Sequence, residues 1–273
     1  MQNPHKVMRL HCDAMTAAFG RRRWLQWAGL TAIGSAASTG PTRAAEPAGV
    51  AVASSVQAAM EQLGAAYTRS SGQHVRFSFG ASGNLVRQIE QGLPVELFLS
   101  ADEDFANRLV RGGWGRDAGV IYATGRLALV AARGTGFELD SQLRGLLAGW
   151  PGIERFAIAN PTLAPYGRAA REALQAAGLW AAAQPRLVQG ENVAQAAQFV
   201  GTGSAQAGLT ALSLVVGRAD PPWRGHVVVD SQLHQPLRQR MVLRRGAGPV
   251  ATGFYAWLQT SAARAVLQTH GFG

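Results

Sequence analysis

The chain has 273 residues, and 47% of them are hydrophobic, so it can bury one large core or two smaller ones and is not a disordered chain. The formal net charge of +10 is typical of nucleic-acid-binding proteins, but it is unevenly distributed. Six of the 26 basic residues and one of the 16 acidic residues lie in residues 1–45, which leaves a net charge of +5 for the rest. The only cysteine, Cys12, also lies there, and this excludes a disulfide framework, a thiolate metal site and a cysteine nucleophile from the remainder.

The first 45 residues have the pattern of an export signal. Residues 21–26 (RRRWLQ) match the twin-arginine pattern of two arginines, any residue, a bulky apolar pair and a polar residue. A weakly hydrophobic stretch follows from Trp27 to about Gly40, and it is too short and too rich in small residues to span a bilayer. We predict a twin-arginine-type signal peptide over residues 1–45, cleaved near Ala44 or Ala45, and a periplasmic location. The alternative is a basic tail with a chance run of arginines.

From residue 49 onward, short β-rich runs alternate with helical segments. We predict strands at 50–53, 74–79 and 96–99. The first is followed by a helix with Val56, Met60, Leu63 and Tyr67 on one face, the second by a helix over 85–90, and the third by a helix that ends near residue 110.

A second alternating set begins at residue 126. We predict strands at 126–131, 155–159 and 207–210, with helices at 167–177 and 193–200. A further strand at 237–243 and two terminal helices at 253–258 and 262–270 complete the chain. The alternation predicts a mostly parallel α/β fold in two sets, and therefore two lobes with a cleft between them.

Four predicted loop-to-helix junctions share one chemistry. They lie at Ser54 and Ser55, at residues 81–84 (ASGN), at 165–167 (PYG) and at 191–193 (ENV). The start of a helix offers unpaired N–H groups and the positive end of the helix dipole, so it suits an anion, and serine hydroxyls add donors. Each junction also has a simpler explanation, because serine is a common helix cap and glycine a common turn residue. Ser54 and Gln57, for example, are spaced as in a capping box.

Competing functions find weaker support. Residues 80–84 (GASGN) resemble the nucleophile elbow of a hydrolase that would use Ser82, but Asn84 stands where that motif has glycine. No histidine pair has metal-binding spacing, and residues 102–104 (DED) are better explained as a solvated helix start than as a metal cluster. The arginines at 238, 240, 244 and 245 fit a charged strand edge, and no helix-turn-helix segment is present, so we expect no nucleic acid partner and no enzymatic activity.

The ordered series of motifs resembles the periplasmic molybdate-binding proteins of ABC transporters over residues 49–272. The motifs that carry the resemblance are residues 52–55 (VASS), 79–89 (FGASGNLVRQI), 92–102 (GLPVELFLSAD), 159–161 (ANP), 165–167 (PYG), 191–193 (ENV), 207–209 (AGL) and 270–272 (HGF). The resemblance implies an α/β, two-lobed periplasmic-binding-protein (type II) fold, in which each lobe is a mixed, mostly parallel sheet flanked by helices. It places lobe one at 47–124 and 236–273 and lobe two at 125–235.

The resemblance also implies a site. In that family hydroxyl and backbone N–H donors hold the oxyanion without a bound cation, and the matching positions here are Ser55, Ser82, Tyr166 and Val193, with Ser54 contributing in some members. One departure concerns Ala211, where many members have a tyrosine; Tyr166 could compensate for it.

Such a site fits molybdate or tungstate, because these ions are fully deprotonated dianions near neutral pH and can only accept hydrogen bonds. Burying them requires many donors to replace water. We therefore expect a monomeric protein, without a cofactor, that binds molybdate or tungstate in the cleft and delivers it to an ABC transporter permease. Another oxyanion, such as sulfate, is the alternative ligand.

Overall fold

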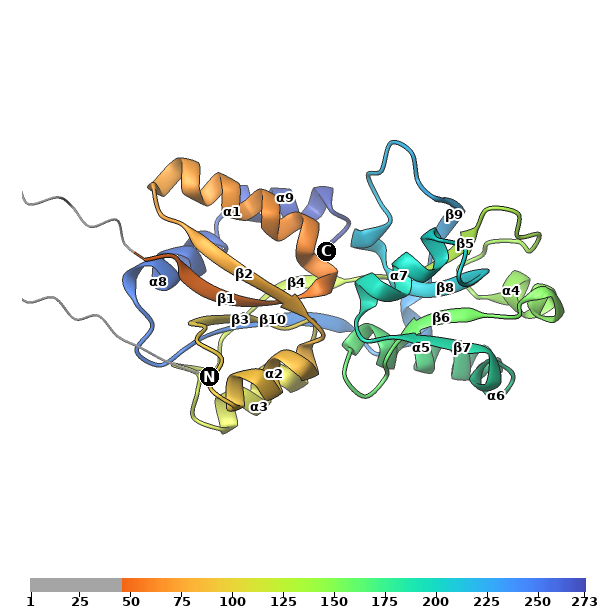
Figure 1. Ribbon diagram of the computed structural model, residues 1–273, viewed down its shortest axis with the longest axis horizontal. Coiled ribbons are helices and arrows are strands. Elements are labelled where there is room, and N and C mark those ends of the chain that lie inside the picture. Colours follow the sequence, from red (N-terminus) through yellow and green to blue (C-terminus); the bar gives the residue numbers. More distant parts are fainter. Residues whose placement is uncertain (1–45) are drawn as a thin grey trace, which may run out of the picture. The chain divides into compact units, whose positions relative to one another are not determined.

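The computed structural model describes residues 46–273, so the predicted signal peptide lies outside the described residues. In this part of the chain the strands form two mixed sheets of five strands each (Figure 1). No helix within residues 46–273 is long and apolar enough to cross a membrane.

The first sheet is flanked by helices on both faces. Its strand order is β2 (Val75–Gly80), β1 (Ala48–Ala53), β3 (Leu97–Leu99), β10 (Leu237–Leu243) and β4 (Val120–Gly125). Helices α1 (Gln57–Ser71), α8 (Pro249–Trp257) and α9 (Ser261–Thr269) cover one face, and α2 (Ser82–Glu90) and α3 (Glu103–Arg111) cover the other (Figure 1). Since successive strand residues point to opposite faces, Val50 and Val52 pack under α1 and α8, whereas Ala51 packs with α2.

The second sheet repeats this plan. Its order is β7 (Leu187–Gly190), β6 (Phe156–Ala159), β8 (Ala207–Ala211), β5 (Leu127–Ala132) and β9 (Trp223–Val228). Helix α5 (Pro165–Ala176) packs with Leu127 and Leu129 on one face, and α7 (Val193–Gly201) packs with Ala128 and Val130 on the other. The short helices α4 (Arg144–Gly149) and α6 (Trp180–Ala183) complete this lobe.

In each sheet four strands run in one direction and one strand runs against them. The reversed strand is β10 in the first sheet, paired antiparallel with β3 and β4, and β5 in the second, paired antiparallel with β8 and β9. The predicted two-lobed, mostly parallel α/β fold is confirmed.

The chain passes between the sheets twice, from β4 to β5 and from β9 to β10. The first passage falls at Gly125–Leu127 and the second between Val228 and Leu237. The lobe limits of 47–124 with 236–273, and of 125–235, stay our proposed division.

Candidate functional site

The structure brings the five predicted site residues together around one small cavity. Ser54, Ser55 and Ser82 come from the first lobe, and Tyr166 and Val193 come from the second. The serines follow the carboxyl ends of β1 and β2, which are parallel neighbours, and Val193 follows β7. The remaining lining residues are Ala53, Gly80, Ala81, Ala101, Ala164 and Pro165. The carboxyl ends of parallel strands are where α/β folds place ligands.

The size of the cavity limits what it can hold. The volume of the cavity is about 10 Å³. Sites for organic ligands span roughly 300–1,000 Å³. As the lobes lie in this structure, the cavity is therefore too small for an amino acid, a sugar or a peptide.

Ser55 carries a hydroxyl without a partner. Residues Ser54–Val56 form a short 3₁₀-helix that leads into α1, and no side-chain cap is found at either start, so the capping-box spacing of Ser54 and Gln57 does not correspond to a cap. Ser55 is buried, and its Oγ has no hydrogen-bond partner among the described residues. Its carbonyl oxygen accepts a 2.5 Å hydrogen bond from the Ser213 hydroxyl of the second lobe, which fixes the Ser55 backbone. A buried hydroxyl left unpaired is costly, which fits a group that meets a ligand.

Ser82 is the first residue of α2 and does not cap it. Helix α2 begins after Ala81 without a side-chain cap, and the Ser82 Oγ instead accepts a 3.0 Å hydrogen bond from the Ala101 N–H. Because a hydroxyl has one proton to donate and this bond uses only an acceptor site, the Ser82 proton stays available. Neither serine therefore caps its helix, and each has a hydroxyl proton that it can donate.

The two glycines at the helix starts approach protein and not the cavity. The Gly83 N–H donates a 2.9 Å hydrogen bond to the Leu163 carbonyl of the other lobe, and a Cβ at Gly83 would lie 2.9 Å from that same oxygen. A Cβ at Gly167 would lie 2.3 Å from the Ala159 carbonyl oxygen. Glycine at both positions therefore permits close packing of the backbone.

The second lobe presents two helix starts. Pro165 and Tyr166 are the first residues of α5, and Val193 is the first residue of α7. The Asn192 side chain accepts hydrogen bonds from the next two N–H groups of α7 and leaves that of Val193 uncapped. The Thr210 hydroxyl donates to the Val193 carbonyl at 3.1 Å, which ties the start of α7 to β8.

The Tyr166 hydroxyl lies in a buried polar network that the sequence did not reveal. Gln239 on β10 donates from Nε2 to the Tyr166 Oη at 3.2 Å. Burial raises the pKa of Tyr166 above its ordinary value, so the hydroxyl stays protonated and can donate. Ser55 lies close enough to oppose this rise slightly, although its Oγ does not reach hydrogen-bond geometry. Ala211, on β8, belongs to the same buried cluster as Tyr166 and contributes no polar group.

The electrostatics of the cavity come from helix starts and neutral donors. Within residues 46–273, no Asp, Glu, Lys, Arg or His lines it. The N-terminal ends of α2, α5 and α7, and the 3₁₀-helix before α1, meet at its wall. A helix start carries the positive end of a dipole and N–H groups without partners inside the helix, so a cavity at which several of them meet favours an anion that only accepts hydrogen bonds.

The acidic run at 102–104 has another role. Asp102 is buried, and its carboxylate accepts from the Phe105 N–H and pairs with Arg168 of the second lobe at 3.0 Å. The prediction of a solvated helix start holds for the exposed Asp104 and is wrong for Asp102. The part of the chain that the structure describes contains no group of three or more His, Cys, Asp or Glu side chains that could hold a metal ion.

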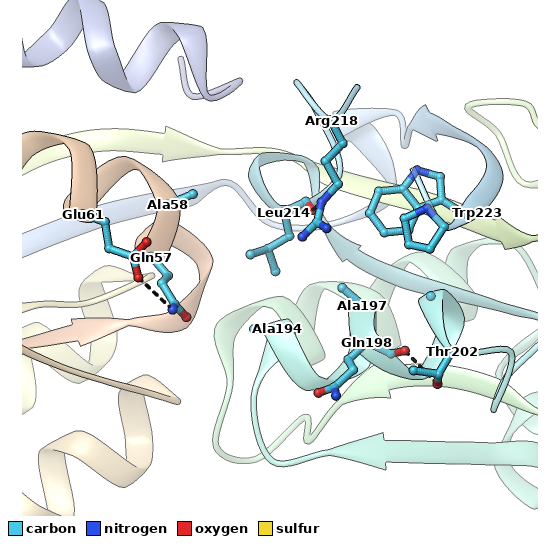
Figure 2. A pocket seen from close by; sticks show the side chains of 12 residues that line it. Gln57, Ala58, Glu61, Ala194, Ala197, Gln198, Thr202, Leu214, Arg218 and Trp223 are labelled. Carbon is cyan, nitrogen blue, oxygen red and sulfur yellow. Dashed lines mark hydrogen bonds between the residues drawn. The ribbon is translucent and has the colours of Figure 1, made fainter. Parts of the chain in front are cut away.

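A larger pocket of about 550 Å³ lies elsewhere, beside α1 and α7 (Figure 2). Some of its polar groups are engaged: Gln57 donates to Glu61, and Thr202 donates to the Gln198 carbonyl. None of the predicted site residues lines it. Within residues 46–273, the pocket is lined by one carboxylate, that of Glu61, and one guanidinium, that of Arg218, so unlike the small cavity it contains charged side chains of both signs.

Three comparisons identify the family. Residues 48–273 match the family described as bacterial extracellular solute-binding protein. The molybdate-binding protein ModA of Azotobacter vinelandii is 34% identical over 82% of this chain and 88% of its own length, and that of Rhodobacter capsulatus is 34% identical over 90% and 95%. The solved periplasmic molybdate-binding protein of Azotobacter vinelandii has a TM-score of 0.76 at 29% identity and covers 83% of this chain and 98% of that chain. The chain belongs to the bacterial extracellular solute-binding proteins and is a member of their molybdate-binding branch.

Proposed function

We propose that this protein binds molybdate or tungstate between its two lobes, through the hydroxyls of Ser54, Ser55 and Ser82 and the backbone N–H groups of Tyr166 and Val193. The observation that carries the proposal is a small cavity that, within residues 46–273, is lined only by neutral groups. Four helix starts meet at it, and the buried Ser55 hydroxyl there has no hydrogen-bond partner in that part of the chain. The names of the relatives supply the ion. We propose further that the protein acts as a monomer and delivers the ion to an ABC transporter permease.

The donor chemistry separates this ligand from phosphate. Hydrogen phosphate retains a proton and requires an acceptor, and no carboxylate among residues 46–273 lines the cavity. Sulfate is also fully deprotonated, so it stays the alternative ligand. The size of the ion must then decide between sulfate and molybdate. A hydrolase reaction at Ser82 lacks support, because its Oγ accepts from a backbone N–H and no histidine of the described residues lines the cavity to serve as a base.

Titration calorimetry on the mature chain with molybdate, tungstate, sulfate and phosphate tests the proposal. We expect saturable 1:1 binding of molybdate and tungstate, much weaker binding of sulfate and none of phosphate. Failure to bind molybdate while sulfate binds tightly would assign the cavity to sulfate.

The proposed periplasmic location depends on the twin-arginine motif. Changing both Arg21 and Arg22 to lysine should leave unprocessed precursor in the cytoplasm, as measured by fractionation. Normal periplasmic levels of the mature form would show that export takes another route.

A further inference from the structure

Gln239 is a buried polar residue that links the two lobes. It lies on β10, where its neighbours Leu237 and Met241 also point inward, and its side chain is fully buried. Its amide contacts two tyrosine hydroxyls: it accepts from Tyr122 at 2.8 Å and donates to Tyr166 at 3.2 Å.

The network sets the direction of each hydrogen bond. Tyr122 donates to the Gln239 Oε1, and this places the NH₂ group of the amide toward Tyr166. The Tyr166 oxygen is thereby an acceptor from Gln239, and its own proton must point away from that amide. The other polar neighbours of this hydroxyl are the Arg126 backbone and the Ser55 side chain, and Ser55 lines the cavity together with Tyr166. A proton that points toward Ser55 is therefore directed to the cavity wall.

The surrounding backbone keeps this arrangement in place. A Cβ at Gly125, where the chain first leaves the first sheet, would lie 2.2 Å from the Tyr166 Oη and 2.8 Å from the Gln239 Nε2. Tyr166 is only 1% exposed. The Tyr166 hydroxyl therefore packs closely against the Gly125 backbone, and the Gln239 amide contacts it as well.

We infer that Gln239 is a positioning residue of the site: it turns the Tyr166 hydroxyl into an obligatory donor toward the bound oxyanion. The inference rests on the proposed function. It adds a side-chain donor to the backbone N–H at 166 and makes the cavity selective for fully deprotonated tetrahedral anions, because a ligand that must donate a proton meets another proton at this point. A donor at Tyr166 also takes the place of the hydroxyl that Ala211 lacks.

The test is a double-mutant cycle with Gln239→Met and Tyr166→Phe, in which molybdate affinity is measured by calorimetry. Methionine is close to glutamine in volume, and Tyr122 keeps the Ser100 carbonyl as an acceptor at 3.3 Å. We expect each single variant to lose about tenfold in affinity, and the double variant to be no weaker than Tyr166→Phe. The preference for molybdate over phosphate should fall in Gln239→Met. Gln189→Met, on an exposed strand position of β7, is the matched control and should be silent.

Independent losses that add in the double variant, or a silent Gln239→Met or Tyr166→Phe, would overturn the inference. Thermal unfolding without ligand identifies a variant that has lost its fold. In that case Tyr122→Phe, which removes only the hydroxyl that orients the amide, takes the place of Gln239→Met; it should weaken molybdate binding about threefold, and only when Tyr166 is present. Ser82→Ala separates the two proposals, because it should weaken binding even if Gln239 has no role.

Discussion

At the scale of single residues, Ser55 and Ser82 offer similar hydroxyls in different situations. The Ser55 Oγ has no partner in the described chain, whereas the Ser82 Oγ accepts from the Ala101 N–H. Removing the Ser55 hydroxyl leaves no other group without a hydrogen-bond partner, whereas removing the Ser82 hydroxyl leaves the buried Ala101 N–H unpaired. The two alanine variants should therefore differ in stability even though both weaken ligand binding.

Ser55→Ala should leave the free energy of unfolding of the ligand-free protein unchanged or slightly higher, because the variant no longer buries an unsatisfied hydroxyl. Molybdate affinity should fall roughly ten- to hundredfold, the equivalent of one hydrogen bond to a charged group at about 1.5–3 kcal/mol. Urea unfolding without ligand and calorimetry with molybdate measure the two quantities. A clear loss of stability in the absence of ligand would contradict the assignment of Ser55 as a ligand donor.

Ser82→Ala should weaken both properties. The unpaired Ala101 N–H should lower the free energy of unfolding by about 1–3 kcal/mol, and molybdate affinity should again fall roughly ten- to hundredfold. The same two measurements apply. If affinity is unaltered in a folded variant, the oxyanion does not reach Ser82.

At the scale of helices and strands, the sequence predicted the elements with strong periodicity. The face formed by Val56, Met60, Leu63 and Tyr67 is buried as predicted, and the strand over 237–243 has the predicted bounds. Strands β4, β7 and β9 were not predicted. Strand β7 has only four residues, and β9 contains Gly225 and exposed Arg224, so neither carries a clear hydrophobic pattern.

Part of the site could be predicted from the sequence because its donors sit at helix starts, which leave local signals in serine, glycine and proline. The supporting groups could not be predicted, because Gln239, Ser213 and Thr210 reach the site only through tertiary contacts. One signal was available for Gln239: it occupies an inward position in an otherwise apolar strand pattern. The sequence also could not show whether the serines cap their helices. The Ser82 Oγ accepts its hydrogen bond from the Ala101 N–H, which the fold brings close, and not from the N–H groups of its own helix.

The end of β4 should be intolerant of any side chain. Gly125→Ala would place a Cβ 2.2 Å from the Tyr166 Oη, so Tyr166 or the strand must move. We expect a loss of about 1–3 kcal/mol in the free energy of unfolding from overpacking, together with weaker molybdate binding. Gly136→Ala, where an added Cβ meets nothing within 4 Å, is the matched control for urea unfolding and calorimetry. Equal behaviour of the two variants would mean that Tyr166 can relocate freely.

At the scale of the whole described molecule, direct contacts tie the lobes together around the cavity. They include the bonds from Gly83 to Leu163 and from Ser213 to Ser55, and the ion pair of Arg168 with Asp102. Because the proposed donors come from both lobes, we expect an arrangement in which the lobes meet to bind the ion better, and the ligand to shift the equilibrium toward that arrangement. Any contact that holds the lobes together then also contributes to affinity, although it never touches the ion.

The ion pair between Arg168 and Asp102 provides the sharpest test of this coupling. The Asp102 side chain is 3% exposed and that of Arg168 29%, so Arg168→Met leaves a buried carboxylate unpaired and should lower the free energy of unfolding by about 3 kcal/mol, the low end for a buried pair. It should also weaken molybdate binding and increase the radius of gyration of the ligand-free protein, as measured by small-angle scattering.

Asp102→Asn is the control for this variant. Asparagine retains an oxygen acceptor for the Phe105 N–H but carries no charge, so adding it to Arg168→Met should restore most of the lost stability.

The pH dependence of the free energy of unfolding gives a second readout. Burial already raises the pKa of Asp102, so the folded state binds the proton more tightly than the unfolded state, and stability increases as the pH falls through the folded pKa. Loss of the Arg168 cation should raise that pKa further. Arg168→Met should therefore recover stability in acid, whereas the double variant should not show this recovery. The contradicting outcome is an Arg168→Met variant that is destabilised in this way but keeps the radius of gyration and the molybdate affinity of the unmodified protein. The ion pair would then contribute to folding and not to lobe closure.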